Sequence, residues 1–153
     1  MIDPVVRAAV AGDAPALAAL EREARSSIAE RRGGTRWLEE HPERGDAWSS
    51  VLASTPTFVA TIDDVALGYV VVEVDGAIAT IEQVYVTPDA RELGFGDELL
   101  AAARRAGAAA GASTIEGHAL PGDRETKNLY ERAGITARLI IVSAPISGPA
   151  RRA

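Results

Sequence analysis

The hydrophobic pattern of the first third of the chain predicts one strand followed by three helical stretches. Residues 5–10 form a short apolar run that is typical of a strand. Asp13 is placed to cap the next helix, where apolar residues recur every three or four positions. These apolar positions are Leu17, Leu20, Ala24 and Ile28. Two shorter helical stretches, 35–41 and 46–54, lie on either side of Pro42, which breaks helices.

Three β-rich segments occupy the middle of the chain, at 57–62, 66–74 and 77–86. They are separated only by short breaks, Asp-Asp and Asp-Gly, whose residue types favour tight turns. Turns of this length join antiparallel neighbours. The three segments therefore predict consecutive hairpins in one antiparallel sheet.

The last third of the chain alternates helices with strands. A long helix is predicted over 94–111, followed by a strand at 113–120, a helix over 123–132 and a final strand at 136–144. The expected buried stripe of the long helix is Leu99, Leu100, Ala103 and Ala106. The complete order, β-α-α-β-β-β-α-β-α-β, predicts an α/β fold with a mixed, mostly antiparallel central sheet flanked by helices.

Length and composition fit one folded domain. We expect residues 1–153 to form a single domain, with 145–153 as a frayed tail. Cysteine is absent, which excludes a cysteine acyl-enzyme and argues against a disulfide framework. The only histidines are His41 and His118, so we expect no metal site.

Charge and hydropathy limit the partners. The net charge of −6 argues against nucleic-acid binding and slightly favours a cationic acceptor. No segment resembles a signal peptide or approaches the roughly 20 apolar residues that span a bilayer. We therefore expect a cytoplasmic protein with no membrane partner. Exposed strand edges make a homodimer plausible.

The stretch most informative about chemistry is VYVTPDARELGFGDELL, from Val84 to Leu100. It joins a strand, a glycine-containing turn and the start of a helix. Gly94 and Gly96 let the backbone approach a ligand, and the free N–H groups of the first helical turn form an anion site. Arg91 adds a positive charge. These features together suit a diphosphate.

Spacing distinguishes among the nucleotide motifs that share this logic. The Walker pattern is ruled out because no Gly-Lys-Ser/Thr ends the loop, and the Rossmann pattern because Leu99 stands at its third glycine. The spacing Arg91-x-x-Gly94-x-Gly96 resembles the acetyl-CoA diphosphate loop of the GNAT acetyltransferases. The preceding IEQVYVTP resembles the central strand of that family. DRETKNLYERAGI resembles its C-terminal segment, in which Tyr130 matches the tyrosine of the family pattern.

The resemblance implies a set of cofactor contacts. The diphosphate loop would comprise Arg91, Glu92, Leu93, Gly94, Phe95, Gly96 and Asp97, and the strand contacts would be Val84, Tyr85 and Val86. Asp97 also suits the first turn of a helix without any ligand. Asp123 would contact the pantetheine arm or, equally well, serve only as a helix cap.

The resemblance also implies direct transfer of an acetyl group from acetyl-CoA to a primary amine of a small molecule or peptide. Tyr130 is the candidate general acid, because a phenol keeps its proton at neutral pH. A backbone N–H near Val84 to Val86 would stabilise the oxyanion. Glu82 lies two residues before Val84, which predicts the same strand face, and is a candidate base. His118 is a rival base.

The region from Arg31 to Ser54 would cover the acceptor in the family arrangement. Trp37 and Trp48 could form an aromatic wall, although tryptophans at helical spacing are more often core. Three glutamates in this region could attract a cation but more often form a solvated face, namely Glu39, Glu40 and Glu43. The alternatives to an enzyme are a non-catalytic acyl-CoA-binding or regulatory domain and a binder of another phosphate ligand.

Overall fold

The computed structural model describes residues 4–147 and contains one five-stranded sheet in the order β1-β2-β3-β4-β5. The first four strands are antiparallel neighbours, and β5 runs parallel to β4. Their bounds are β1 Pro4–Ala8, β2 Thr57–Ile62, β3 Val65–Asp75, β4 Ile78–Val86 and β5 Thr114–Gly117. The predicted mixed, mostly antiparallel sheet is confirmed.

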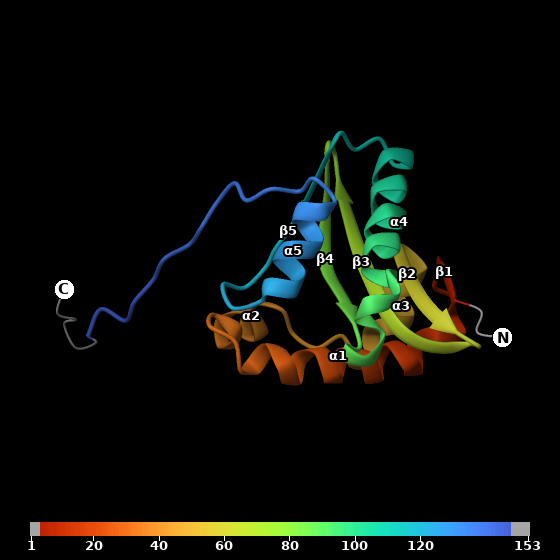
Figure 1. Cartoon of the computed structure of the whole chain (residues 1–153), viewed down its shortest axis with the longest axis horizontal. Coiled ribbons are helices and arrows are strands. Elements are labelled where there is room, and N and C mark those ends of the chain that lie inside the picture. The colour runs from red at the N-terminus through yellow and green to blue at the C-terminus, as the bar shows by residue number, and fades with distance from the viewer. Residues whose placement is uncertain (1–3, 148–153) are drawn as a thin grey trace.

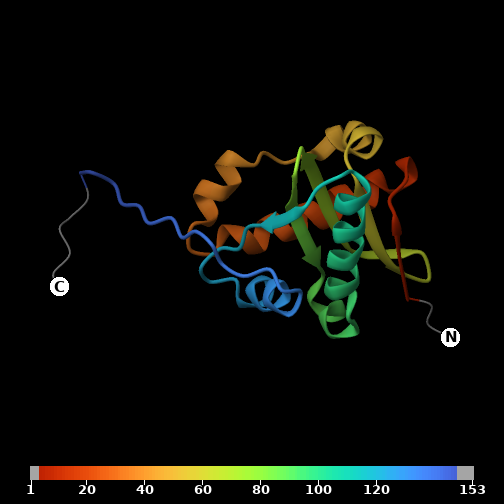
Figure 2. The ribbon, with the colours of Figure 1, turned by 90° about the horizontal axis from the view of Figure 1, so that it is seen from above.

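Helices cover both faces of this sheet (Figures 1 and 2). The α-helices are α1 Ala14–Ala29, α2 Gly34–Glu40, α3 Trp48–Ser54, α4 Phe95–Ala109 and α5 Arg124–Arg132. Three 3-10 turns join them to the strands, namely η1 Ala11–Asp13, η2 Gly45–Ala47 and η3 Pro88–Leu93. Helices α4 and α5 pack on one face and α1 and α3 on the other, which gives three layers.

Alternation along the strands divides the apolar side chains between two cores. On β3, Val70 and Val72 face α4, whereas Tyr69 and Val71 face α1. This explains why the centre of β3 is apolar at every position, because both faces of the strand are covered. The sheet is consequently packed on both faces where it borders the site described below.

The tight turn between β2 and β3 follows the chemistry of its residues. Asp63 and Asp64 have φ angles of 49° and 65°. Two consecutive positive φ values characterise the type I′ turn, whose twist matches antiparallel strands. Aspartate tolerates this conformation better than most side chains because it is short and polar.

A buried carboxylate ties the α1 layer to the connection before α3. Glu21 is 1% exposed, and its Oε2 accepts a 2.6 Å hydrogen bond from Arg44 Nη1. Its Oε1 accepts from the backbone N–H of Arg44 at 3.0 Å and from Trp48 Nε1 at 3.1 Å. Arg44 also donates to the side chain of Gln83 on β4, at 2.9 Å. The network satisfies the buried charge and connects α1 to β4.

Strand β4 contains a β-bulge at its centre. Val71 lies opposite Gln83, but the next residue of β3, Val72, lies opposite Ile81. Glu82 is therefore an extra residue on β4, and the alternation of side chains shifts by one there. The sequence carries no local sign of this bulge.

Strands β4 and β5 separate just after the level of the bulge. Their parallel pairing runs from Ile78 and Thr114 to Ile81 and Gly117 and ends there. Strand β4 continues to Val86, still paired with β3. The split leaves the β5 side of residues 82–86 open to a cleft.

Three expectations from the sequence are wrong in detail. The predicted strand at 136–144 forms no strand: this segment runs exposed and away from the sheet (Figure 1). The strand predicted at 113–120 is shortened to β5, because residues 118–120 turn away where the strands split. Asp13 precedes α1 but does not cap it, since its carboxylate is held by Arg7 at 2.8 Å. Residues 148–153 of the predicted tail lie outside the described residues.

Candidate functional site

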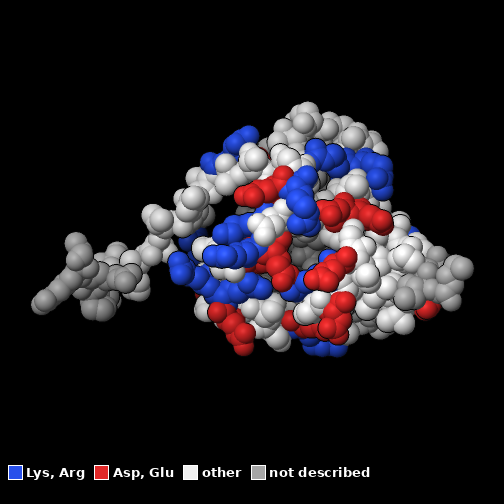
Figure 3. Space-filling model, viewed as in Figure 1, with Lys and Arg blue, Asp and Glu red and all other residues white. Residues whose placement is uncertain are grey.

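The cleft at the β4–β5 split has a volume of about 630 Å³. That size is typical of a site for a small molecule or cofactor. Its walls come from the end of α1, residues 82–86 of β4, the start of α4, residues 118–120 and α5. Acidic and basic side chains are interspersed around a hollow on this face (Figure 3). The split therefore brings together segments that are distant in sequence.

Two backbone amides of β4 point into the cleft. Thr87 N–H donates to the Leu67 carbonyl at 2.8 Å, so the preceding residue, Val86, directs its own N–H and C=O away from β3. The Val86 carbonyl accepts a 2.9 Å bond from Arg91 Nε on that side. Val84, two residues earlier and beyond the bulge, has the same orientation. These are the amides that the sequence analysis placed near an oxyanion.

The glycine turn and the first turn of α4 form the second part of the cleft. Gly94 has φ 81°, and an added Cβ would meet nothing within 4 Å, so the cleft is open beside it. Gly96 has another role than expected, because a Cβ there would lie 3.1 Å from Leu129 Cδ1. Its missing side chain allows α5 to pack closely on α4, and only its backbone lines the cleft.

Two residues of the predicted loop direct their side chains elsewhere. The side chain of Phe95 is 1% exposed and belongs to the core, whereas that of Leu93 is 56% exposed and does not line the cleft. Both can contribute only backbone atoms to a ligand. The first N–H groups of α4 lack intrahelical partners, and together with Gly94 they fit a diphosphate.

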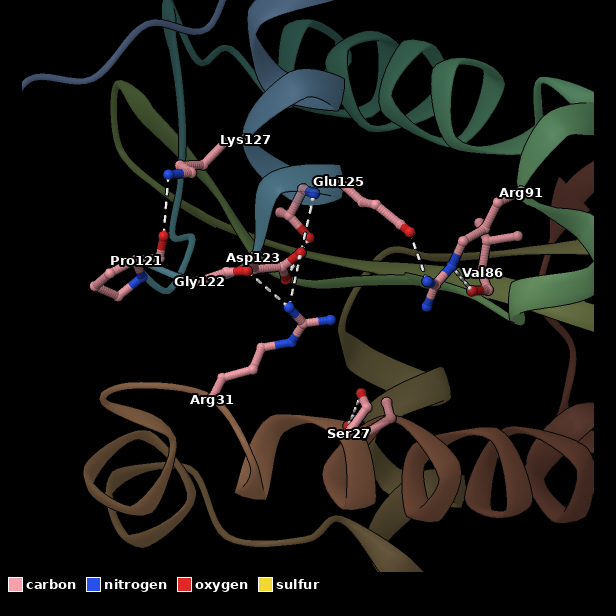
Figure 4. A network of polar contacts seen from close by, with 11 residues as sticks. Ser27, Arg31, Val86, Arg91, Pro121, Gly122, Asp123, Glu125 and Lys127 are labelled. Atoms are coloured by element: carbon pink, nitrogen blue, oxygen red, sulfur yellow. Dashed lines mark hydrogen bonds and ion pairs between the residues drawn. The ribbon is translucent and has the colours of Figure 1, made fainter.

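Arg91 is held at the edge of the cleft by three contacts, of which those with Val86 and Glu125 are drawn in Figure 4. Its Nε donates to the Val86 carbonyl, its Nη1 pairs with Glu125 at 2.6 Å, and its guanidinium lies 5.8 Å from the Tyr85 ring centre. The Glu125 carboxylate is well exposed, so the ion pair contributes little and can exchange for a ligand anion. Glu92 also borders the cleft.

The remaining acid of the loop, Asp97, is exposed and pairs with Arg132 at 3.1 Å. This pairing offsets the negative charge that the sequence analysis placed beside a phosphate site. Asp97 also lies in the first turn of α4, where a carboxylate interacts favourably with the helix dipole. It therefore does not preclude an anion there.

Asp123 caps the N-terminus of α5, which was one of the two roles predicted for it. Its carboxylate accepts from Thr126 N–H at 3.1 Å and from the Thr126 hydroxyl at 2.7 Å. Arg31, two residues after α1, approaches the same carboxylate at 3.9 Å and donates to the Gly122 carbonyl at 3.0 Å (Figure 4). Asp123 also lines the cleft. Arg31 thus bridges α1 and α5 at the rim.

Tyr130 projects from α5 into the cleft wall and is 7% exposed. Burial, with a smaller contribution from the Asp123 carboxylate, raises the pKa of its phenol, and a backbone hydrogen bond at His118 partly opposes this. The phenol therefore holds its proton at neutral pH. Its hydroxyl lies against Gly117, where an added Cβ would be only 2.6 Å from the oxygen.

The bulge places the side chains of Glu82 and Val84 on opposite faces of the sheet. The expectation that they lie on the same face is therefore wrong. Val84 packs towards the α4 core, whereas Glu82 lies near Glu73, His41 and Arg44 on the α1 side. Both still line the cleft. Burial, followed by the hydrogen bond and the charge of Glu73, raises the pKa of the Glu82 carboxyl. A raised pKa brings a carboxylate closer to the range that suits a general base.

Only part of the predicted aromatic wall lines the cleft. Trp37 does so and stacks on His41 with ring centres 4.3 Å apart. Trp48 is 1% exposed and lies in the α1 core. The three glutamates of this region, Glu39, Glu40 and Glu43, are exposed and outside the cleft, as a solvated face predicts. His118 is exposed at the cleft wall.

Three residues that line the cleft or act on a residue lining it were missed in the sequence, because their roles depend on distant partners. Arg31, Glu73 and Glu125 carry no motif, and each acts on a residue of another element. Within residues 4–147, no three His, Cys, Asp or Glu side chains gather as metal ligands. No helix in this part of the chain has both the length and the apolarity to cross a membrane.

Comparison with known proteins identifies the family of the chain. Residues 17–135 match the model of the acetyltransferase (GNAT) family, which is most of the chain. The chain belongs to this family. It is accordingly an acyltransferase whose fold places the cleft between β4 and β5. No sequence among the curated proteins is similar enough to count as a match.

Solved structures share the fold over nearly their whole length. An aminoglycoside N-acetyltransferase, AAC(6')-Iy, in complex with a bisubstrate analogue of CoA, is 18% identical with a TM-score of 0.71, covering 94% of this chain and 99% of its own. A GCN5-related N-acetyltransferase from Ralstonia eutropha is 25% identical with a TM-score of 0.71, covering 95% and 100%. A tetramutant of the BH1408 protein from Bacillus halodurans is 14% identical with a TM-score of 0.77, covering 93% and 99%.

Proposed function

We propose that this protein transfers an acetyl group from acetyl-CoA to a primary amine of a small molecule. The observation that carries the proposal is the joining, in one cleft, of a helix N-terminus, two inward backbone amides and a buried tyrosine. Acetyl-CoA supplies the activated acyl group as a thioester. The residues of the chain bind and orient this cosubstrate and move protons.

Binding of the diphosphate is assigned to the turn between η3 and α4. The N–H groups of Gly96 and its neighbours meet the anion, and Gly94 supplies the positive φ and the open space that the turn needs. Arg91 adds a cation that is already fixed by the Val86 carbonyl. The amides of Val84 and Val86 then face the reacting carbonyl and stabilise negative charge on its oxygen.

Two side chains are assigned to proton transfer. Tyr130 donates a proton to the departing thiolate, a role that its raised pKa supports because the phenol stays protonated until needed. Glu82 takes the proton of the amine, directly or through water, and its carboxylate also attracts an ammonium group. The aminoglycoside acetyltransferase among the similar structures supports a small cationic acceptor.

The decisive test compares Tyr130→Phe with the unaltered protein. Loss of a positioned general acid should lower turnover roughly 10²–10⁴-fold while leaving acetyl-CoA affinity nearly intact. Turnover is measured as thiol release against a panel of amines, with no background from the protein because it lacks cysteine. Affinity is measured by calorimetry.

Tyr69→Phe is the matched control. Tyr69 is fully buried, and its hydroxyl has no hydrogen-bond partner among the described residues, so its removal should leave activity unchanged. If Tyr130→Phe turned over at the unaltered rate, the assignment of the acid would be wrong. Acetyl-CoA binding without turnover across the whole panel would instead favour a non-catalytic acyl-CoA-binding domain.

Thermal unfolding offers an independent check of the ligand. Acetyl-CoA at about 100 times its Kd should add roughly 2.7 kcal/mol, or about 5–11 °C, for a protein of this length. NAD and ATP should have little effect, because the loop spacing fits neither a Rossmann nor a Walker site. An equal shift with ATP would contradict the assignment of the site to coenzyme A.

A further inference from the structure

The segment after α5 combines strong strand-forming character with almost complete exposure. Residues 136–144 include four consecutive large apolar side chains. Their exposed fractions are 82% for Leu139, 80% for Ile140, 65% for Ile141 and 89% for Val142. β-branched residues of this kind are favoured in strands, and such a run is unusual on a protein surface. Figures 1 and 2 show the segment leaving α5 and running away from the sheet.

The sheet has an open edge close to the origin of this segment. β5 is the last strand in the sheet order and pairs only with β4 among the described strands. Its outer edge therefore presents unpaired backbone N–H and C=O groups, which readily accept another strand. Glu116 at the centre of β5 is exposed. The described chain thus carries both an unpaired strand sequence and an unpaired strand edge.

We propose that residues 136–144 of one copy pair with the outer edge of β5 in a second copy, and that the exchange is reciprocal. A two-fold arrangement satisfies both segments and both edges at once, because each copy supplies one of each. Charge also favours a copy of this chain as the partner. Arg138 is the only charged residue of the segment, and in the exchanged strand it would lie beside the exposed Glu116 of the second copy, a pair of opposite charges.

The exchange has a consequence for the cleft. β5 leads directly into residues 118–120, which line one wall of the cleft. A strand added along β5 would continue past this wall and cover it from outside. The partner copy would therefore help to close the cleft on the side of His118. This inference does not depend on which amine the protein acetylates.

Molar mass in solution is the first test, using the full chain and light scattering after size exclusion. We expect twice the mass of one chain for the unaltered protein. Ile140→Lys should shift it to the mass of one chain, because a charge would replace an apolar side chain that the exchange buries. Val65→Lys is the matched control: Val65 is also exposed, at 60%, but lies in the β2–β3 hairpin, and this variant should remain a dimer.

A disulfide test identifies the contact itself. The chain contains no cysteine, so a Glu116→Cys and Arg138→Cys double variant carries only the two introduced thiols. Under mild oxidation it should form covalent dimers on a denaturing gel, whereas a Val65→Cys and Arg138→Cys variant should form far fewer. A monomeric unaltered protein, a dimer unaffected by Ile140→Lys, or a disulfide formed within one chain would each overturn the proposal.

Discussion

Replacing Gly117 with alanine should misplace the hydroxyl of Tyr130 without removing it. Gly117 ends β5, and an added Cβ would lie 2.6 Å from the tyrosine oxygen and 2.7 Å from Cζ. Ordinary van der Waals contacts begin at 3.4 Å. Tyr130 is itself packed into the cleft wall, so the ring must tilt or slide to make room.

The required displacement follows from these distances. The difference between 3.4 and 2.6 Å is about 0.8 Å, which the hydroxyl must move to restore ordinary contact. A misplacement near 1 Å costs on the order of 10²-fold in rate when a reacting group depends on position. We therefore expect Gly117→Ala to lower turnover about 10²-fold, equivalent to about 2.7 kcal/mol of activation free energy. Acetyl-CoA affinity should change little.

Thiol-release kinetics on four variants tests this reasoning. Gly12→Ala is the control for the substitution itself, because a Cβ at Gly12 meets nothing within 4 Å, and it should behave like the unaltered protein. If the loss acts through the hydroxyl, adding Gly117→Ala to Tyr130→Phe should cost little more than Tyr130→Phe alone. Unaltered turnover in Gly117→Ala, or fully additive losses in the double variant, would refute the argument.

Two further predictions concern carboxylates around the cleft. Glu73→Gln removes the charge and the hydrogen bond of Glu73 that raise the pKa of Glu82, so the acid limb of the kcat/KM profile should move to lower pH. If the limb did not move, a group other than Glu82 would be the base. Glu125→Gln frees Arg91 from an exposed ion pair and should tighten acetyl-CoA binding by up to about fivefold in calorimetry. Glu131→Gln, on the same helix but outside the cleft, should leave the affinity unchanged.

The parts of the molecule that could be predicted from the sequence depend on contiguous residues. The β2–β3 hairpin follows from two adjacent aspartates, and the start of α4 from Gly94 and the residues after it. The cap of α5 follows from Asp123 and Thr126 in the same way. In each case the residue determines the conformation or hydrogen bonding of backbone only a few positions away, so spacing alone carries the information.

The acceptor side of the cleft depends on pairing between distant segments. The face of Glu82 is set by the register of β4 against β3, and one inserted residue reverses the expectation drawn from simple alternation. The position of Arg31 depends on the approach of α1 to Asp123. Neither relation leaves a trace in the local pattern, because each is decided by which elements pack together.

The segment 136–144 combines both situations. Its run of apolar and β-branched residues predicts a strand from local information, yet a strand is stable only when another edge pairs with it. Within the described part of the chain, the segment pairs with no strand, and its apolar side chains stay exposed. Under the proposed exchange, the segment forms the strand that its sequence predicts, because β5 of a second copy provides the edge. That pairing supplies the missing hydrogen bonds and buries the apolar surface.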